Sequence, residues 1–369
     1  MKFYVLFIAV YLCSCSSFKY LPGRNPGSFV LEIQKDGLLD CFEPGLQSSE
    51  MPVYFEGSAV AFDGKRIYIA SDKDIPGKSP VLSLYRDSLS SGLRALTYLD
   101  NPEIIGSKKI EDMACYEGRI LFITTAFDRI NLKDNSWDNY NSIIYYNVKS
   151  KEADIITPDT LHNATTSVYL RQQISDALQP LYPGGPPYFK IEGIAALPGR
   201  TLLLGVREIG ASYKDFQYHA GILRVTFREE PNGKIYLNND MKLVYHFNPS
   251  AHSKLKTPLG LSGLTYDPSQ KCIYLLTSYE KEPTSSGIGA YIWQLPISYF
   301  DNKSENAPVV GIHLQEEPLF LPHKAEGICM LNKHTLFIIC DDDRIVEGWF
   351  DETPRLSHQA KYYIVKVNP

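Results

Sequence analysis

A short pattern of polar and apolar positions occurs five times along the chain. Each copy starts with Ser or Glu, continues as an alternating segment, and is followed by a tight turn and a more apolar run. The first copy reads Ser58-Ala59-Val60-Ala61-Phe62 before Arg66-Ile67-Tyr68-Ile69, with Asp63-Gly64 at the turn. Two such runs joined by a Gly-containing turn are typical of a β-hairpin. The polar positions that begin the copies are Ser58, Glu111, Glu192, Ser262 and Glu326.

Further apolar or alternating runs follow each hairpin, so each copy supplies about four strands. These runs lie at residues 81–85, 93–98, 142–146, 221–225, 291–293 and 362–367. Four-stranded antiparallel units repeated at intervals of 53, 81, 70 and 64 residues predict an all-β fold, a five-bladed β-propeller. We expect residues 28–33 to supply the outer strand of the last blade and to close the ring. A degenerate sixth blade in the second or third interval is the alternative.

The second interval contains a segment with helical spacing. Residues 166–182 place Val168, Leu170, Ile174, Leu178 and Leu181 at spacings close to those of one helix face. The Gly-Gly-Pro-Pro sequence at 184–187 then ends the pattern. We therefore expect a short helical insertion over one face of the propeller, followed by a return to the third blade.

The amino-terminal residues have the pattern of a signal peptide. Lys2 precedes an apolar run at 3–12 and the small-residue segment Leu12-Cys13-Ser14-Cys15. The run is too short to span a bilayer. Its ending resembles the lipobox of bacterial lipoproteins, which implies cleavage before Cys15 and acylation of that thiol; a plain secretory signal is the alternative. The predicted organisation is a signal peptide at 1–14, a tether at 15–27 and a propeller at 28–369. The chain would then lie in a bacterial cell envelope, at the outer membrane or the periplasmic face, and reach the membrane through its lipid anchor only.

Cysteine spacing and charge exclude several classes of function. The five remaining cysteines are too scattered for a disulfide framework or a zinc site, although one pair could still form a bridge. They are Cys41, Cys115, Cys272, Cys329 and Cys340. The chain is mildly acidic, with 37 Lys and Arg against 42 Asp and Glu, and its basic residues do not cluster. Nucleic acid is therefore not expected as a partner.

The polar heads of the repeats are the main candidate site. The first strand of each propeller blade lines the axis, so Ser58, Glu111, Glu192, Ser262 and Glu326 should converge there. Three converging carboxylates repel one another and need neutralisation. Calcium, which takes six to eight oxygen ligands, is the predicted cofactor, whereas zinc would need His or Cys.

The chain also offers a metal-free way to neutralise the carboxylates. Lys109, Lys190 and Lys324 each stand two residues before a Glu, and therefore on the same strand face. Three ammonium groups could balance three carboxylates without metal, or raised pKa values could leave some carboxyls protonated.

The order Ser, Glu, Glu, Ser, Glu resembles that of the calcium-activated nucleotidases, the apyrase family of five-bladed propellers. Phe62-Asp63-Gly64-Lys65, Leu170-Arg171-Gln172-Gln173 and Lys324-Ala325-Glu326-Gly327-Ile328 resemble local segments of that family. The resemblance implies that the five axial residues hold calcium. It also implies that the chain hydrolyses phosphoanhydride or phosphoester bonds, of nucleoside diphosphates or triphosphates for example. The family's aspartate-rich amino-terminal stretch and its site tryptophans have no counterpart in this chain. Phytase-like and esterase-like secreted propellers also carry Glu-Gly-Ile units.

Charged residues at the ends of the second strands supply further candidates. Arg207 matches a family position rich in Arg and is the predicted clamp for a phosphoryl group; an ion pair with Glu208 or a neighbouring blade is the alternative. Asp72, Asp74 and Asp342 are candidates for orienting a water or a second ion, against a simple solvated rim. The rival function is a non-catalytic propeller with a structural calcium that binds a protein, a glycan or an envelope component.

Overall fold

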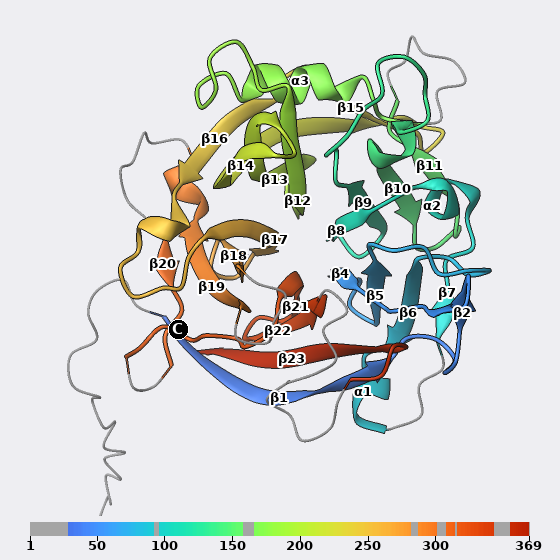
Figure 1. Ribbon diagram of the computed structural model, residues 1–369, viewed down its shortest axis with the longest axis vertical. Helices are drawn as coiled ribbons and strands as arrows, with labels where there is room; N and C mark the ends of the chain where they lie inside the picture. The colour runs from blue at the N-terminus through green and yellow to red at the C-terminus, as the bar shows by residue number, and fades with distance from the viewer. Residues whose placement is uncertain are drawn as a thin grey trace, which may run out of the picture.

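The computed structural model describes residues 29–91, 96–157, 166–281, 287–300, 308–313, 316–342 and 355–368. Five antiparallel sheets surround a central axis, and their innermost strands point toward it (Figure 1). The five-bladed propeller is thus confirmed, and the described residues form no sixth blade.

The blades follow one another along the chain, and the strands of each blade are ordered from the axis outward. Blade 1 contains β4 (Gly57–Phe62), β5 (Arg66–Ser71), β6 (Val81–Tyr85) and β7 (Thr97–Tyr98). Blade 2 contains β8 (Ile110–Tyr116), β9 (Ile120–Thr125), β10 (Ile143–Asn147) and β11 (Ala153–Ile155). Blade 3 contains β12 (Tyr188–Leu197), β13 (Thr201–Ser212) and β14 (Asp215–Glu229), which pairs with both β15 (Ile235–Leu237) and β16 (Lys242–Phe247). Blade 4 contains β17 (Leu259–Asp267), β18 (Cys272–Glu280), β19 (Ile288–Pro296) and β20 (Val309–Val310). Blade 5 contains β21 (Ala325–Asn332), β22 (Thr335–Cys340), β23 (Gln359–Asn368) and β1 (Val30–Asp40).

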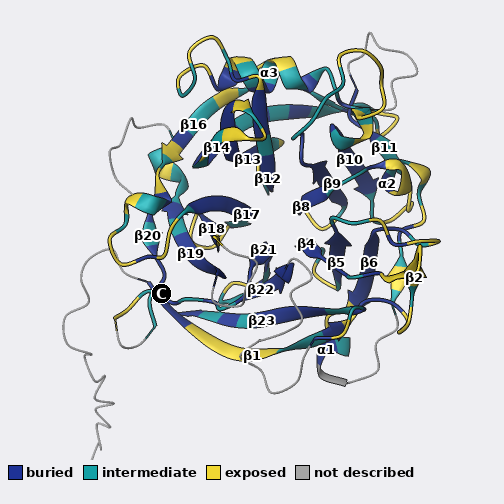
Figure 2. Ribbon diagram, in the orientation of Figure 1, coloured by how far each residue is buried: buried dark blue, intermediate teal, exposed yellow. Residues whose placement is uncertain are grey.

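The amino-terminal strand closes the ring, as predicted. β1 pairs antiparallel with β23, from Val30 opposite Asn368 to Asp40 opposite Gln359. It is longer than the predicted strand, and Ser28 lies outside the described residues. The middle of β1 faces solvent, whereas Leu31 and Leu39 are buried (Figure 2). Closure therefore joins the two ends of the described chain in one sheet.

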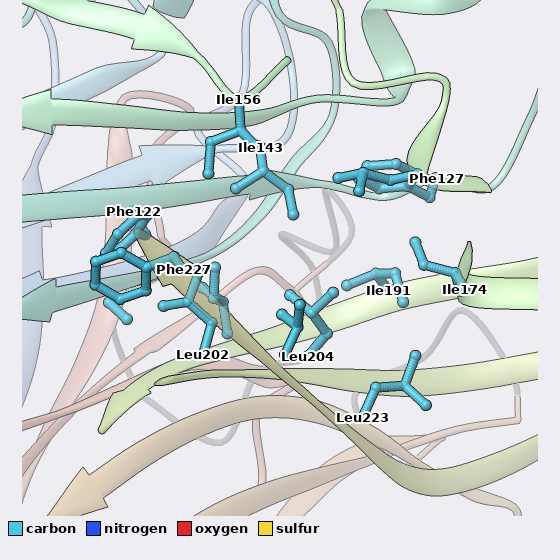
Figure 3. Packing of buried hydrophobic residues seen from close by; sticks show 14 of the residues in the cluster. Phe122, Phe127, Ile143, Ile156, Ile174, Ile191, Leu202, Leu204, Leu223 and Phe227 are labelled. Atoms are coloured by element: carbon cyan, nitrogen blue, oxygen red, sulfur yellow. The ribbon is translucent and has the colours of Figure 1, made fainter. Parts of the chain in front are cut away.

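The predicted helical insertion is present but shorter than its pattern. Helix α3 (Leu170–Ala177) lies at the rim of the ring beside blade 3 (Figure 1). Its Leu170 and Ile174 are buried, and Ile174 packs near Ile191 and Phe127 (Figure 3). Residues 158–165 of the same interval lie outside the described residues. The extra length of the third interval goes into the long strand β14 and its two partners, not into another blade.

Apolar side chains fill the spaces between neighbouring blades. Five clusters of buried residues each combine residues of two adjacent blades. The cluster between blades 2 and 3, for example, joins Phe122 and Ile143 to Leu202, Leu204 and Phe227 (Figure 3). Burial at this scale is the main favourable contribution to folding.

A few short elements lie outside the blades. These are β2 (Gln47–Ser48), β3 (Met51–Pro52), α1 (Ser88–Ser91), α2 (Pro102–Gly106) and the 3₁₀ turns Asp138–Tyr140, Pro249–Ala251 and Ile297–Tyr299. No helix in the described ranges is long and apolar enough to cross a membrane. The lipobox-like segment and Cys15 lie outside the described residues, so the lipid anchor stays a prediction. Cys41, Cys115, Cys272, Cys329 and Cys340 are all free thiols, and the alternative of one bridged pair is not realised.

Candidate site at the mouth of the central channel

Every innermost strand carries a β-bulge, and the bulged residue is the polar head of the sequence pattern. In blade 2, Ile110 pairs with Thr125 and Asp112 pairs with Thr124, so Glu111 is skipped by the ladder. A bulge leaves one residue unpaired and redirects its side chain. The residues skipped in this way are Ser58, Glu111, Glu192, Ser262 and Glu326. All five are buried, at 4% exposure or less. The structure thus gives the five predicted residues equivalent positions around the axis.

The two Ser residues of this axial ring bridge neighbouring blades. Ser58 Oγ donates a hydrogen bond to the carbonyl oxygen of Ile110 at 2.5 Å. Ser262 Oγ donates to that of Ala325 at 3.0 Å. Each bond joins one innermost strand to the next, so both hydroxyls already have a structural role.

Lysine side chains neutralise the axial carboxylates. Lys190 Nζ binds Glu192 and also lies 3.3 Å from Glu111 Oε1. Lys109 Nζ is 3.5 Å from Glu111 Oε1 and 3.1 Å from Asp128 Oδ2. The backbone of Lys109 is left-handed, with φ at 59°, a conformation that is uncommon for a residue other than Gly. Two carboxylates of the ring therefore share one ammonium group.

The third carboxylate has its own lysine. Lys324 Nζ lies 3.1 Å from Glu326 Oε1 and 3.3 Å from Asp341 Oδ2. It also approaches Glu280 at 3.3 Å. All three Lys–Glu pairs that the sequence raised as the metal-free alternative are present.

The three axial carboxyls differ in their pKa shifts. Burial raises the pKa of Glu111, because Lys190 and Lys109 only partly offset it. Burial also raises the pKa of Glu326 well above its usual range, although Lys324 opposes the rise. For Glu192 burial acts in the same direction, but Arg207 and Lys190 together hold the pKa below its usual range. When the pKa values of neighbouring carboxyl groups differ in this way, one group can hold a proton and donate it while its neighbour is an anion.

Arg207 does not face the channel mouth as a free clamp. Its guanidinium is 3% exposed and its Nη1 lies 2.9 Å from Glu192 Oε2. The same nitrogen donates to Ser278 Oγ at 2.7 Å and to the carbonyl of Leu261 at 3.2 Å. The guanidinium also lies over the ring of Tyr218, at 5.1 Å. The ion-pair alternative therefore describes Arg207, which fixes Glu192 and joins blades 3 and 4.

The three predicted Asp residues have different environments. Asp72 lies beside the axial ring, and its Oδ1 is buried without a hydrogen-bond partner in the described part of the chain. Burial and then nearby Asp341 raise its pKa well above the usual range. Asp74 instead faces solvent and pairs with Lys108 at 2.6 Å.

The carboxylate of Asp342 contacts the segment that leads into β21. It accepts a hydrogen bond from the backbone N–H of Lys324 at 3.1 Å and contacts His323 Nδ1 at 3.1 Å. Asp342 thus positions the start of β21. Its neighbour Asp341, for which the sequence pattern carried no separate signal, contacts the axial lysine Lys324.

Calcium at the axial residues would have to compete with cationic side chains that already contact them. Oxygen donors predominate, and Glu111 Oε1 lacks a hydrogen bond, as does Asp72 Oδ1. However, ammonium and guanidinium groups already contact the ring carboxylates. Within the described ranges, no group of three or more His, Cys, Asp or Glu side chains could hold a metal ion. Calcium would have to displace lysines such as Lys190.

A sixth axial residue, Asp112, has no equivalent in the other blades. It follows Glu111 and is fully buried. Its Oδ2 accepts hydrogen bonds from the backbone N–H groups of Ile194 at 2.8 Å and Leu264 at 3.2 Å, and its Oδ1 accepts from Met113 at 2.8 Å. Asp112 therefore ties the innermost strands of blades 2, 3 and 4 together. In the sequence, only its position directly after Glu111 indicated that Asp112 lies at the axis.

Two adjoining pockets open beside the ring. The first, the basic pocket, has a volume of about 250 Å³ and is lined by Asp72, Lys73, Asp74, Lys108, Lys109, Arg129 and Tyr140. The second, the aromatic pocket, has about 520 Å³ and is lined by Lys109, Asp128, Arg129, Trp137, Tyr188, Lys190, Glu208, Tyr213 and Phe216. Lys109 and Arg129 line both pockets. The charged strand ends predicted as a polar rim thus form shaped cavities.

Comparison with known proteins adds little beyond the fold. No protein-family model matches the chain, and no curated protein does either. Among solved structures, a luciferin-regenerating enzyme has 10% identity and a TM-score of 0.38, covering 93% of this chain and 96% of its own. The PQQ-bound aldose sugar dehydrogenase from Streptomyces coelicolor has 10% identity and a TM-score of 0.41, covering 93% and 99%. A glucose dehydrogenase has 12% identity and a TM-score of 0.41, covering 92% and 99%. Similarity this low says nothing about activity, and it is the order of its own strands that makes this chain a five-bladed β-propeller.

Proposed function

We propose that this chain is a phosphohydrolase that binds a small phosphorylated molecule in the basic pocket. The observation that carries the proposal is the pocket lining, in which four cationic side chains stand together with Asp72, whose Oδ2 contacts Lys73 at 3.1 Å and whose Oδ1 accepts no hydrogen bond in the described residues. The four cations are Lys73, Lys108, Lys109 and Arg129. Cationic groups held in place favour the charge of a transferring phosphoryl group.

Ion pairs hold the cations of the basic pocket before a ligand arrives. Arg129 makes a two-point contact with Asp128, with Nε at 2.9 Å from Oδ1 and Nη2 at 2.7 Å from Oδ2. Its guanidinium also lies 4.4 Å from the ring centre of Tyr140. Lys73 Nζ is 2.8 Å from Glu56 Oε2. Preorganised donors lose little further freedom when substrate binds, which favours catalysis. In this proposal Lys109 and Arg129 take the clamping role first assigned to Arg207.

Asp72 is the proposed proton donor to the leaving oxygen. A carboxyl must be protonated near neutral pH to act in this way, and the raised pKa of Asp72 supports that state. Its placement at the wall of the basic pocket provides the required access. General acid catalysis contributes about 10²-fold to 10⁴-fold in rate.

Calcium-dependent hydrolysis of the apyrase type is the more specific form of this proposal. Glu111 Oε1 and Asp72 Oδ1, which accept no hydrogen bond in the described residues, and the hydroxyls of the axial ring support it. Because the lysines already contact the carboxylates, calcium binding requires Lys190 and Lys324 to move. An excess of calcium would therefore be needed to compete with those contacts.

A panel of nucleotides, sugar phosphates and aryl phosphates tests hydrolysis by release of phosphate. We expect Asp72→Asn to lower kcat about 100-fold or more, and Lys109→Met to raise KM for every substrate. Lys149→Met, in an exposed turn of blade 2, is the matched control and should leave both constants unchanged. Absence of phosphate release from the whole panel contradicts the hydrolase.

Calcium and Glu192→Gln separate the two forms of the proposal. Activity that needs calcium and is lost both with chelator and in Glu192→Gln supports the apyrase-like form. Activity indifferent to calcium supports the metal-free site. A calcium-dependent rise in Tm without turnover would favour the rival, a non-catalytic propeller with a structural calcium that binds an envelope ligand.

We further propose that the protein is anchored in a bacterial envelope through Cys15, which mass spectrometry of the membrane fraction would test.

A further inference from the structure

We infer that the ligand carries a sugar or aryl ring next to its phosphoryl group, and that this ring lies in the aromatic pocket. The inference rests on the proposed function for the position of the phosphoryl group. It adds a second binding region, formed by Trp137, Tyr188, Tyr213 and Phe216, to which the proposed reaction assigns no ligand.

The four aromatic residues come from three separate parts of the chain. Trp137 lies between β9 and β10, Tyr188 in β12, Tyr213 between β13 and β14, and Phe216 in β14. Together they border one cavity of about 520 Å³. That volume lies within the range of small-molecule sites. Convergence of aromatic rings from distant segments on one cavity is unusual for a merely solvated rim.

Two of these rings are exposed despite their size. Tyr213 is 67% exposed and Trp137 is 46% exposed. Exposed large apolar side chains that cluster at a cavity often mark a binding surface. Neither ring contributes to the buried clusters between the blades. Lys214 Nζ lies 5.3 Å from the ring centre of Tyr213 on one side, and the exposed parts of both rings remain accessible to a planar or ring-shaped group.

The other two rings are supported from behind. Tyr188 and Phe216 contact each other with ring centres 5.8 Å apart, and Phe216 packs edge-on against Tyr218 at 5.3 Å. The hydroxyl of Tyr188 donates a hydrogen bond to Glu208. These contacts fix one wall of the pocket, so a ligand ring meets a preformed surface.

Charges in the aromatic pocket indicate an anionic ligand. The lining contains three cations, Lys109, Arg129 and Lys190, against the two carboxylates Asp128 and Glu208. Lys109 and Lys190 also contact the ring carboxylates Glu111 and Glu192. Three cationic groups at the wall still disfavour a quaternary ammonium ligand, although aromatic cages bind such cations elsewhere.

The shared wall sets the geometry of the ligand. Lys109 and Arg129 border both pockets, and both contact Asp128. A phosphoryl group held by this pair would therefore project its substituent into the aromatic pocket. A ring in that position stacks on aromatic faces, whereas an acyclic chain gains less contact.

Isothermal titration calorimetry with non-hydrolysed ligands tests this inference separately from turnover. The probes are inorganic phosphate, methylphosphonate, phenylphosphonate and the phosphonate analogue of glucose 1-phosphate. We expect at least one ring-bearing probe to bind about tenfold or more tighter than methylphosphonate, a gain of the size that a single stacking contact provides. A tighter phenyl probe indicates an aryl ring, and a tighter glucose probe indicates a sugar.

Trp137→Ala and Tyr213→Ala should each remove most of that gain without changing the affinity for methylphosphonate. Leu132→Ala is the matched control, because Leu132 is 91% exposed in the same loop as Trp137. If the ring-bearing probes bind more tightly but no substrate releases phosphate, this inference holds and the hydrolase is rejected. Equal affinity for all four probes, no binding of any probe, or a gain that survives both substitutions would overturn it.

Discussion

Lys190 is the residue on which the charge balance of the axis depends most directly. Its side chain is 14% exposed and contacts two of the three axial carboxylates, Glu111 and Glu192. Burial alone would lower the pKa of its ammonium group, but the two carboxylates raise it well above its usual value. Removal of this shared cation would leave Glu111 with Lys109 and Glu192 with Arg207, so both buried anions would lose part of their compensation.

Lys190→Met should therefore lower the free energy of unfolding by about 3 kcal/mol at neutral pH, as expected when one partner of a buried ion pair is removed. Urea unfolding followed by circular dichroism measures the change. The loss should shrink at lower pH, where Glu111 takes up a proton more readily. Lys149→Met serves as the exposed control; an equally small effect of both substitutions would mean that Glu111 and Glu192 are neutralised by other groups.

A second residue-scale prediction concerns the His219–His246 pair across β14 and β16. Nδ1 of His219 lies 3.0 Å from Nε2 of His246. Burial, and next the neighbouring His246, lowers the pKa of His219 to about 4. Because the unfolded state then binds protons that the folded state does not, stability should fall as pH drops from about 6.5 to about 4.

The His219→Asn/His246→Asn variant should show a weaker fall than the unsubstituted chain. We expect a difference on the order of 1 kcal/mol at pH 5, after allowance for solvent screening of these partly exposed rings. Urea unfolding at pH 7.5 and at pH 5 provides the comparison. Parallel losses in both proteins would show that the pair does not titrate as described.

At the scale of the elements, the bulged innermost strands bring the blades into close contact at the axis. The residue after the bulge is Gly in blades 3, 4 and 5. A Cβ at Gly327 would lie 2.8 Å from backbone atoms of Ala59 and Val60, and one at Gly263 would lie 2.5 Å from the carbonyl oxygen of Glu326. These glycines permit the close approach that brings the polar heads together.

Gly327→Ala should destabilise the fold by about 2 kcal/mol, because backbone atoms on the next blade cannot yield to the added methyl group. Gly106→Ala is the matched control, since a Cβ there meets nothing within 4 Å. Thermal and urea unfolding of both variants measure the change in the free energy of unfolding. A Gly327→Ala variant as stable as the control would show that the inner strands separate easily.

For the whole molecule, ring closure depends on pairing the first described strand with the last. β1 covers the edge of β23 and buries Leu31 and Leu39. An uncovered edge strand offers unpaired backbone groups to other chains. Closure through both ends of the chain therefore protects the sheet as well as stabilising it.

A chain that begins at residue 41 should lose about 2 kcal/mol for each of these buried leucines and should associate through the exposed edge. The comparison is a chain that begins at residue 29, which retains all of β1. Urea unfolding measures the loss of stability, and light scattering measures the association. A monomeric chain from residue 41 with unchanged stability would mean that β1 is dispensable for closure.

Elements with a strong local signal were predictable. The hairpin pattern located the innermost strands, and the spacing of Leu170, Ile174 and Leu178 located α3. Strands such as β20, only two residues long, have no local signal of comparable strength. Arg207 and Asp342 were proposed as site residues from their position at strand ends, which carries no information on their partners. In the structure Arg207 contacts Glu192, and Asp342 contacts Lys324 and His323.

The sequence by itself determined the propeller fold with at least five blades, the closing strand and the five axial residues, because a repeated pattern places equivalent positions at equivalent points of a propeller. The structure excluded the sixth blade among the described residues. Only the tertiary structure decided what surrounds those residues. The bulges at Glu111 and its equivalents, the lysines that contact the carboxylates, and the meeting of Trp137 with Tyr213 at one cavity depend on packing between blades. Contacts between segments distant in sequence leave no periodic trace along the chain, so the pattern that revealed the ring could not reveal the pockets beside it.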